Sequence, residues 1–209
     1  MHRARRLAAV VALALAAIGC GDSSGTTDGL TADEIPVANT PAGGFRETFP
    51  EPVLARCTEP LVAGAPDLRG LWRTLRAERM GEPVAADDRI HAYVERIEQC
   101  GDRIVDMGGG TVSDARADGT EANGVHDVSA FDYTTPLHVI ASYEGGVFVL
   151  RPVGIPGVEV TRRLDAAGQM IWTRPDRGGL VVTLARDGDG AGTPVNTFFP
   201  YQPNAPTAP

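Results

Sequence analysis

The sequence predicts an all-β protein in which an antiparallel up-and-down sheet closes into a barrel. Two observations favour this fold class. Apolar residues occur in short runs or in alternation with polar residues, as in half-buried strands. Short links rich in Gly and Asp join successive runs, which is typical of hairpins. Hairpins in succession form one sheet, and a sheet of many strands closes on itself or splits into two packed sheets.

Residues 1–19 have the pattern of an export signal. A basic segment with Arg3, Arg5 and Arg6 precedes the unbroken apolar run Leu7–Ile18. This run is too short to span a bilayer comfortably, but it suits the apolar core of a signal peptide. The sequence therefore predicts export from the cytoplasm.

The end of this segment, Ala17-Ile18-Gly19-Cys20, resembles the lipobox of bacterial lipoproteins. The resemblance implies that Cys20 becomes the first mature residue and carries acyl chains such as palmitate. The protein would then be anchored by lipid to a membrane of the cell envelope, facing the periplasm or the exterior. A plain secretory signal followed by a coincidental cysteine is the alternative. The small, polar stretch Gly21–Gly29 favours the anchor, because it is typical of a flexible tether.

Residues 20–66 are predicted to form this tether and an extended arm. The segment Leu30–Pro66 is rich in Pro, Gly, Ala and Thr and has little periodicity, so we expect it to lie along the domain without a fold of its own. Residues 200–209 are Pro-rich and predict a mobile, disordered C-terminal tail. The barrel domain is accordingly assigned to residues 67–199.

Two cysteines remain if Cys20 carries lipid. In the oxidising space outside the cytoplasm, Cys57 and Cys100 are predicted to form a disulfide that pins the arm to the domain. A zinc site is the weaker interpretation, because the His and Cys residues do not have metal-ligand spacing.

The first strand of the domain is predicted within Leu68–Ala77, whose side chains alternate between two faces. Residues 88–100 are ambiguous. Apolar residues at helical spacing follow a helix-capping Asp87-Asp88, but the same stretch is consistent with a strand that ends at the turn Gly101-Asp102. Neighbouring hairpins favour the strand. The acidic segment Ser113–Asn123 contains Asp118-Gly119 and is interpreted as hairpin links.

The C-terminal half of the domain continues the pattern of strands and short turns. The expected strands are Pro136–Tyr143, Val147–Leu150, Val158–Thr161, Met170–Thr173 and Leu180–Leu184, the last extending to Arg186.

The start of the first strand, Gly70-Leu71-Trp72, resembles the Gly-x-Trp motif of the lipocalin and calycin superfamily. This resemblance implies a lipocalin/calycin-like barrel in which Trp72 closes one end and Arg186, from the last strand, packs across it. Phe131-Asp132-Tyr133 is loosely similar to the family's Thr-Asp-Tyr element. The alternative is that Trp72 is simply a buried tryptophan at the start of a strand.

Composition and motifs exclude several function classes. The net charge is −8, and all 19 Lys and Arg residues are Arg, without a basic stripe. These features argue against nucleic acid as a partner.

The histidines are scattered, and the Gly-rich segment Gly108–Thr111 lacks the Lys of a phosphate loop. We therefore predict a non-catalytic protein that needs no cofactor or metal; its oligomeric state is not indicated.

Two functions remain. The first is a membrane-anchored binding protein whose barrel holds a small apolar ligand or lipid. The candidate cavity residues are Val139, Phe148, Val160 and Trp172. The second is a structural or interaction lipoprotein of the cell envelope whose barrel is filled by side chains. The barrel interior distinguishes the two.

Overall fold

The computed structural model describes residues 29–122 and 138–187 of the chain. Its regular structure consists of β-strands and two short 3-10 segments, η1 (Arg89–Ala92) and η2 (Pro175–Arg177). The strands are β1 (Gly70–Arg79), β2 (Glu82–Pro83), β3 (Val94–Cys100), β4 (Arg103–Gly108), β5 (Thr111–Arg116), β6 (Asp118–Ala122), β7 (Val139–Glu144), β8 (Val147–Pro152), β9 (Val160–Leu164), β10 (Met170–Arg174) and β11 (Leu180–Arg186).

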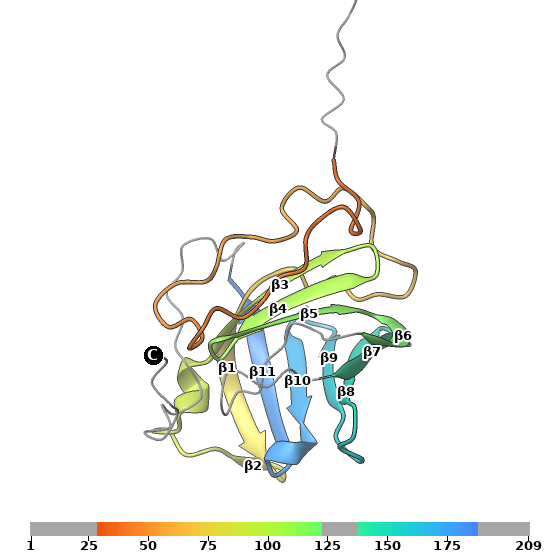
Figure 1. The fold of residues 1–209 in the computed structure, drawn as a ribbon. Helices are drawn as coiled ribbons and strands as arrows, with labels where there is room; N and C mark the ends of the chain where they lie inside the picture. Colours follow the sequence, from red (N-terminus) through yellow and green to blue (C-terminus); the bar gives the residue numbers. More distant parts are fainter. Residues whose placement is uncertain (1–28, 123–137, 188–209) are drawn as a thin grey trace, which may run out of the picture.

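The strands form one antiparallel sheet in the order β5-β4-β3-β1-β11-β10-β9-β8-β7-β6, with β2 paired to β1. Most neighbours in the sheet are also consecutive in the chain, so the topology is up-and-down. The two end strands, β5 and β6, are joined through Ala117, and the sheet curls into a nearly closed barrel (Figure 1). The predicted all-β, antiparallel up-and-down barrel is therefore confirmed.

The ambiguous segment 88–100 contains both of the structures that its pattern indicated. Asp88 caps η1 by accepting a hydrogen bond from Ile90 N at 2.9 Å, but the helical stretch ends after this short segment. From Val94 the chain is the strand β3, which turns at Gly101-Asp102 into β4. The preference for a strand is confirmed for Val94–Cys100.

The interpretation of Ser113–Asn123 as hairpin links was wrong for most of its length. Residues 113–116 belong to β5, and β6 follows after Ala117. Asp, Ser and Gly are poor strand formers, but the pairing of β5 with β4 and of β6 with β7 outweighs this preference.

In β1, an irregularity between Thr74 and Arg76 shifts the alternation, so that Ala77 rather than Arg76 is buried with Trp72.

The main hydrophobic core lies inside the barrel and draws side chains from nine of the described strands. Its fully or largely buried members are Leu68, Trp72, Ala77, Ile90, Tyr93, Ile97, Ile104, Ala115, Ala117, Val139, Ala141, Phe148, Val160, Met170, Trp172, Leu180, Val182 and Leu184.

A second core lies between the outer face of the barrel and the arm, residues 29–66, which crosses β3, β4 and β5 (Figure 1). The arm contributes Ala32, Ile35, Phe45, Phe49 and Leu54, and the sheet contributes Leu71, Val94, Cys100, Val105, Met107 and Val112. The arm is extended, with a single bridge between Leu30 and Cys57 among its described residues. Strands β3 and β4 are therefore buried on both faces.

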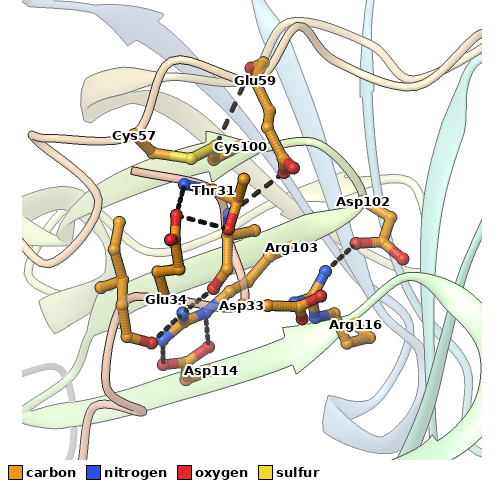
Figure 2. Close-up of polar contacts among 12 residues, drawn as sticks. Thr31, Asp33, Glu34, Cys57, Glu59, Cys100, Asp102, Arg103, Asp114 and Arg116 are labelled. Carbon is orange, nitrogen blue, oxygen red and sulfur yellow. Dashed lines mark hydrogen bonds and ion pairs between the residues drawn. A yellow bond between two sulfur atoms is a disulfide. The ribbon is translucent and has the colours of Figure 1, made fainter. Parts of the chain in front are cut away.

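One buried arginine fastens the arm to the sheet. Arg103 on β4 pairs with Asp114 on β5, with its Nε at 2.9 Å and its Nη2 at 2.7 Å from the two carboxylate oxygens (Figure 2). The same guanidinium donates to the arm carbonyls of Ala32 and Ile35, both at 2.7 Å, and to that of Pro36 at 2.9 Å. All five of its N–H groups are thus used, as a buried cation requires.

The predicted disulfide between Cys57 and Cys100 is confirmed, with a Cα–Cα distance of 6.1 Å. It joins the arm to the end of β3, close to the Arg103 contacts (Figure 2). The bridge closes a loop between residues 43 positions apart. Closing such a loop lowers the conformational entropy of the unfolded chain and so stabilises the folded state.

Removing this bridge should lower the stability of the whole domain. For Cys57→Ser/Cys100→Ser we expect the free energy of unfolding to fall by about 4 kcal/mol, the chain-entropy value for a loop of this size. Urea unfolding followed by tryptophan fluorescence measures the change. Cys20→Ser serves as the matched control and should keep the wild-type midpoint. An unchanged midpoint in the double variant would contradict the structural role of the bridge.

Candidate functional site

The four candidate cavity residues are buried inside the barrel. Val139, Phe148, Val160 and Trp172 are buried members of the interior core, on β7, β8, β9 and β10 respectively. The structure brings them together across four consecutive strands. Cys20, the predicted lipidation site, lies outside the described residues, as do residues 200–209 and Phe131-Asp132-Tyr133.

Trp72 is fully buried near the start of β1. The indole Nε1 donates to the carbonyl of Leu68 at 2.7 Å, and the Arg186 guanidinium lies 4.9 Å from the centre of the ring system. Arg186 Nη2 also donates to the carbonyl of Asp67 at 2.6 Å. Gly70 begins β1 with a φ of +122°, a value that favours glycine. Arg186 therefore packs across Trp72, while the closure of the barrel by Trp72 stays a prediction.

A row of interior residues runs across the sheet at the level of Trp172. In register, Phe148 pairs with Arg162, Arg162 with Trp172, Trp172 with Val182, and Val182 with Ala77. Cross-strand partners point to the same face of a sheet, so Arg162 projects into the apolar interior. Its side chain is only 5% exposed.

Arg162 reaches two carboxylates on the other side of the barrel. Its Nη2 lies 2.9 Å from Glu95 Oε2 on β3 and also pairs with Asp106 on β4, and its Nε donates to Glu95 Oε1 at 3.4 Å. Tyr93 adds a hydrogen bond, its hydroxyl donating to Glu95 Oε2 at 3.0 Å. Glu95 is 0% exposed. We call Tyr93, Glu95, Asp106 and Arg162 the interior polar cluster.

The protonation states within the interior polar cluster follow from its geometry. Burial raises the pKa of Tyr93 well above its usual value, and the negative charges of Glu95 and Asp106 raise it further. Burial alone would lower the pKa of Arg162, but the charges of Asp106 and Glu95 raise it above the ordinary value. Tyr93 is thus a neutral donor and Arg162 a permanent cation, held between two acidic side chains.

Trp172 lies beside this cluster. Its ring stacks on Tyr93 at a centroid distance of 4.8 Å, and the guanidinium of Arg162 lies 5.6 Å from the ring centroid. The indole Nε1 is buried and has no hydrogen-bond partner among the described residues. Leaving such a donor unpaired costs about 1–3 kcal/mol.

A second polar bridge crosses the interior nearer Trp72. Gln99 on β3 donates through Nε2 to Tyr143 Oη on β7 at 2.9 Å and to the carbonyl of Pro66 at 3.1 Å. Its Oε1 accepts from Leu68 N at 2.6 Å. The amide therefore connects two walls of the barrel to the segment that enters β1.

The sequence analysis did not identify the interior polar cluster. A signal was present: Glu95 lies two residues from both Tyr93 and Ile97, and Arg162 lies two residues from both Val160 and Leu164. A charged residue flanked at i−2 and i+2 by apolar residues shares their face of a strand. That pattern marks a buried charge once the strands are known.

Within the described part of the chain, the other candidate chemical groups do not form a comparable site. Cys57, Cys100 and Glu59 have potential ligand atoms within 4.8 Å of one another, but both sulfurs are in the disulfide and offer no thiolate to a metal. His91 contacts the carbonyl of Ala85 at 3.0 Å, and His138 lies 3.6 Å from Glu121. His126 lies outside the described residues.

Comparisons with known proteins give limited information. No protein-family model matches the chain, and no curated protein matches it. Among solved structures, it is similar to zebrafish ileal bile acid-binding protein complexed with cholic acid, with 21% identity, a TM-score of 0.40, and coverage of 57% of this chain and 98% of that one. The likeness is too low to transfer a ligand. Within residues 29–122 and 138–187, no helix is long and apolar enough to cross a membrane.

Gly108 is required for the position of Tyr93. A Cβ at Gly108 would lie 2.3 Å from Tyr93 Oη, which is a clash, and 3.2 Å from Glu95 Cβ, which is a tight contact. We expect Gly108→Ala to lower the free energy of unfolding by about 1–3 kcal/mol through overpacking. The loss should be smaller in a Tyr93→Phe background, where the hydroxyl is absent. A double-mutant cycle in urea measures both values, and equal losses in the two backgrounds would refute the predicted clash.

Proposed function

We propose that this protein is a non-catalytic binding protein of the bacterial cell envelope, anchored by lipid on Cys20, whose barrel binds a small, largely apolar molecule. The observation that carries the binding proposal is the interior polar cluster, a charged group enclosed by an apolar barrel core.

The interior polar cluster buries charge at a cost in free energy. Removing Glu95, Asp106 and Arg162 from water is unfavourable, and buried ion pairs of this kind are often no more stabilising than apolar side chains of the same size. A barrel selected for packing alone would gain little from them. Ligand sites, in contrast, are mostly apolar with a few fixed polar groups that orient the ligand. The combination of interior core, cluster and unpaired Trp172 Nε1 matches that description.

A second candidate function is that of an interaction scaffold with a barrel filled by side chains. The observation that favours it is that side chains from opposite walls meet inside the barrel. Arg162 on β9 reaches Glu95 on β3, and Tyr143 on β7 contacts Gln99 on β3. Bridges of this kind hold the walls together without a ligand.

Ligand binding distinguishes the two functions. If the barrel holds an apolar molecule, binding stabilises the folded state by mass action, about 2.7 kcal/mol at a ligand concentration 100 times its dissociation constant. We expect the melting temperature of the Cys20→Ser chain to rise with the concentration of at least one lipid among fatty acids, monoacylglycerols, phospholipids and isoprenoids. The absence of any shift, together with a crystal structure showing a filled interior, would favour the scaffold.

Lipid attachment is tested separately. In a bacterial host, the wild-type chain should fractionate with membranes and carry an added acyl mass, because the lipobox resemblance implies acylation of Cys20. Cys20→Ser should lose that mass and become soluble in the envelope fraction. Mass spectrometry and fractionation measure both, and Ser24→Ala, in the tether next to Cys20, is the matched control. Membrane association that persists without acyl mass would contradict the proposal.

A further inference from the structure

A carboxylate lies beside the disulfide, and the three side chains together form a cluster of potential metal ligands. The sulfurs of Cys57 and Cys100 and a carboxylate oxygen of Glu59 lie within 4.8 Å of one another (Figure 2). In the disulfide the sulfurs bind no metal, because the ligand is the thiolate. After reduction the same positions carry two thiols next to a carboxylate. Thiolates and carboxylates are ligands that Zn²⁺ takes in proteins.

The spacing of this cluster suits the coordination sphere of zinc. Zn–S bonds of about 2.3 Å and Zn–O bonds of about 2.0–2.2 Å place the ligand atoms of a tetrahedral site roughly 3.5–3.8 Å apart. Because the three ligand atoms already lie within 4.8 Å of one another, small side-chain rotations suffice once the S–S bond is open. Three protein ligands leave the fourth position of the metal to solvent.

The backbone around Cys57 is held in place by contacts that do not depend on the disulfide. Leu30 N donates to the carbonyl of Arg56 at 2.9 Å, and Thr58 N donates to the carbonyl of Leu30 at 3.1 Å. Arg103 holds the same arm against β4 through three arm carbonyls. Reduction breaks one covalent bond and leaves these hydrogen bonds in place, so the two sulfurs stay close to each other.

The carboxylate of Glu59 is also held in a fixed position. Its Oε2 accepts a hydrogen bond from Ala32 N at 3.1 Å. The same oxygen lies over Gly101, where a Cβ would approach it to 2.8 Å. The charge of Glu59 acts on Arg116, but that guanidinium is already paired with two other carboxylates. Glu59 therefore stays beside the sulfurs as an anionic oxygen ligand.

We propose that reduction of the Cys57–Cys100 disulfide creates a metal site, in which the two thiolates and the Glu59 carboxylate bind a thiophilic divalent cation such as Zn²⁺. A dithiol reductant supplies two electrons and two protons to the disulfide and becomes a disulfide itself. The cation then displaces both thiol protons to solvent as the two metal–sulfur bonds form. The arm is thus fastened to the end of β3 in both redox states, by a covalent bond or through the ion.

Metal titration of the Cys20→Ser full chain tests this site, because that variant has Cys57 and Cys100 as its only cysteines. The chain is reduced with a phosphine, freed of the reductant and titrated with Cd²⁺ in the absence of oxygen. Thiolate binding to Cd²⁺ is measured by sulfur-to-metal charge-transfer absorption in the ultraviolet. Competition with a chromophoric chelator gives the dissociation constant of Zn²⁺. We expect one ion per reduced chain and none for the oxidised chain.

Matched variants assign the three ligands. Glu59→Gln keeps an oxygen acceptor for Ala32 N but loses the anionic ligand, so it should weaken Zn²⁺ binding by at least about tenfold. Glu51→Gln changes an exposed acidic residue of the arm outside the cluster and should keep the wild-type dissociation constant. Cys57→Ser leaves one thiolate and should abolish the stoichiometric charge-transfer signal.

A site that belongs to the folded chain also stabilises the fold. Zn²⁺ should raise the melting temperature of the reduced chain with concentration and leave that of the oxidised chain unchanged. If reduction alone unfolds the chain, Zn²⁺ should restore the circular dichroism of the oxidised protein.

Three results would overturn the metal site. The first is that the reduced chain binds no ion, or does not regain its fold with one. The second is that Glu59→Gln binds Zn²⁺ as tightly as the parent chain does. The third is that the reduced chain binds Zn²⁺ equally well in urea, which would identify a dithiol without a folded site.

Discussion

Arg103 holds the N-terminal arm against the barrel, and this contact determines what the sheet can bury on each side. Its guanidinium joins β4, β5 through Asp114, and three carbonyls of the arm. With the arm in place, apolar side chains such as Val105 and Met107 are covered on the outside. The inward-facing residues of the same strands are then shielded from water on both sides. The disulfide Cys57–Cys100 strengthens the same attachment at the end of β3.

Because water is excluded from both faces of these strands, the charged side chains of the interior polar cluster interact strongly with one another. Glu95 and Asp106 lie on β3 and β4, beneath the part of the barrel that the arm covers, and Arg162 approaches them from β9. In such a region charges attract strongly, but each has lost its hydration. The cluster therefore links the walls of the barrel tightly and tolerates the loss of one partner poorly. The interior polar cluster has a high desolvation cost, but its charges are held in fixed positions. It is therefore suited to orienting one kind of ligand inside an otherwise apolar barrel.

The two tryptophans of the barrel differ in their hydrogen bonding. The indole Nε1 of Trp72 donates to the carbonyl of Leu68, and Arg186 packs on its ring. Around Trp172, in contrast, one indole donor has no partner among the described residues. The contrast between two tryptophans of the same barrel, one satisfied and one not, distinguishes a structural position from a candidate recognition position.

The sequence by itself determined the alternation of the strands, the hairpin turns and the pairing of Cys57 with Cys100, because each depends on short-range periodicity or on the small number of cysteines. It did not determine which side chains of each strand face the barrel interior, and only the structure places Phe148 and Trp172 there. It left β5 and β6 unrecognised, since Asp, Ser and Gly have low strand propensity and only pairing partners decide such cases. Only the tertiary structure placed Arg162 against Glu95 and Asp106. Those residues lie more than 50 positions apart in the chain. No local pattern specifies which strands face each other across a closed barrel.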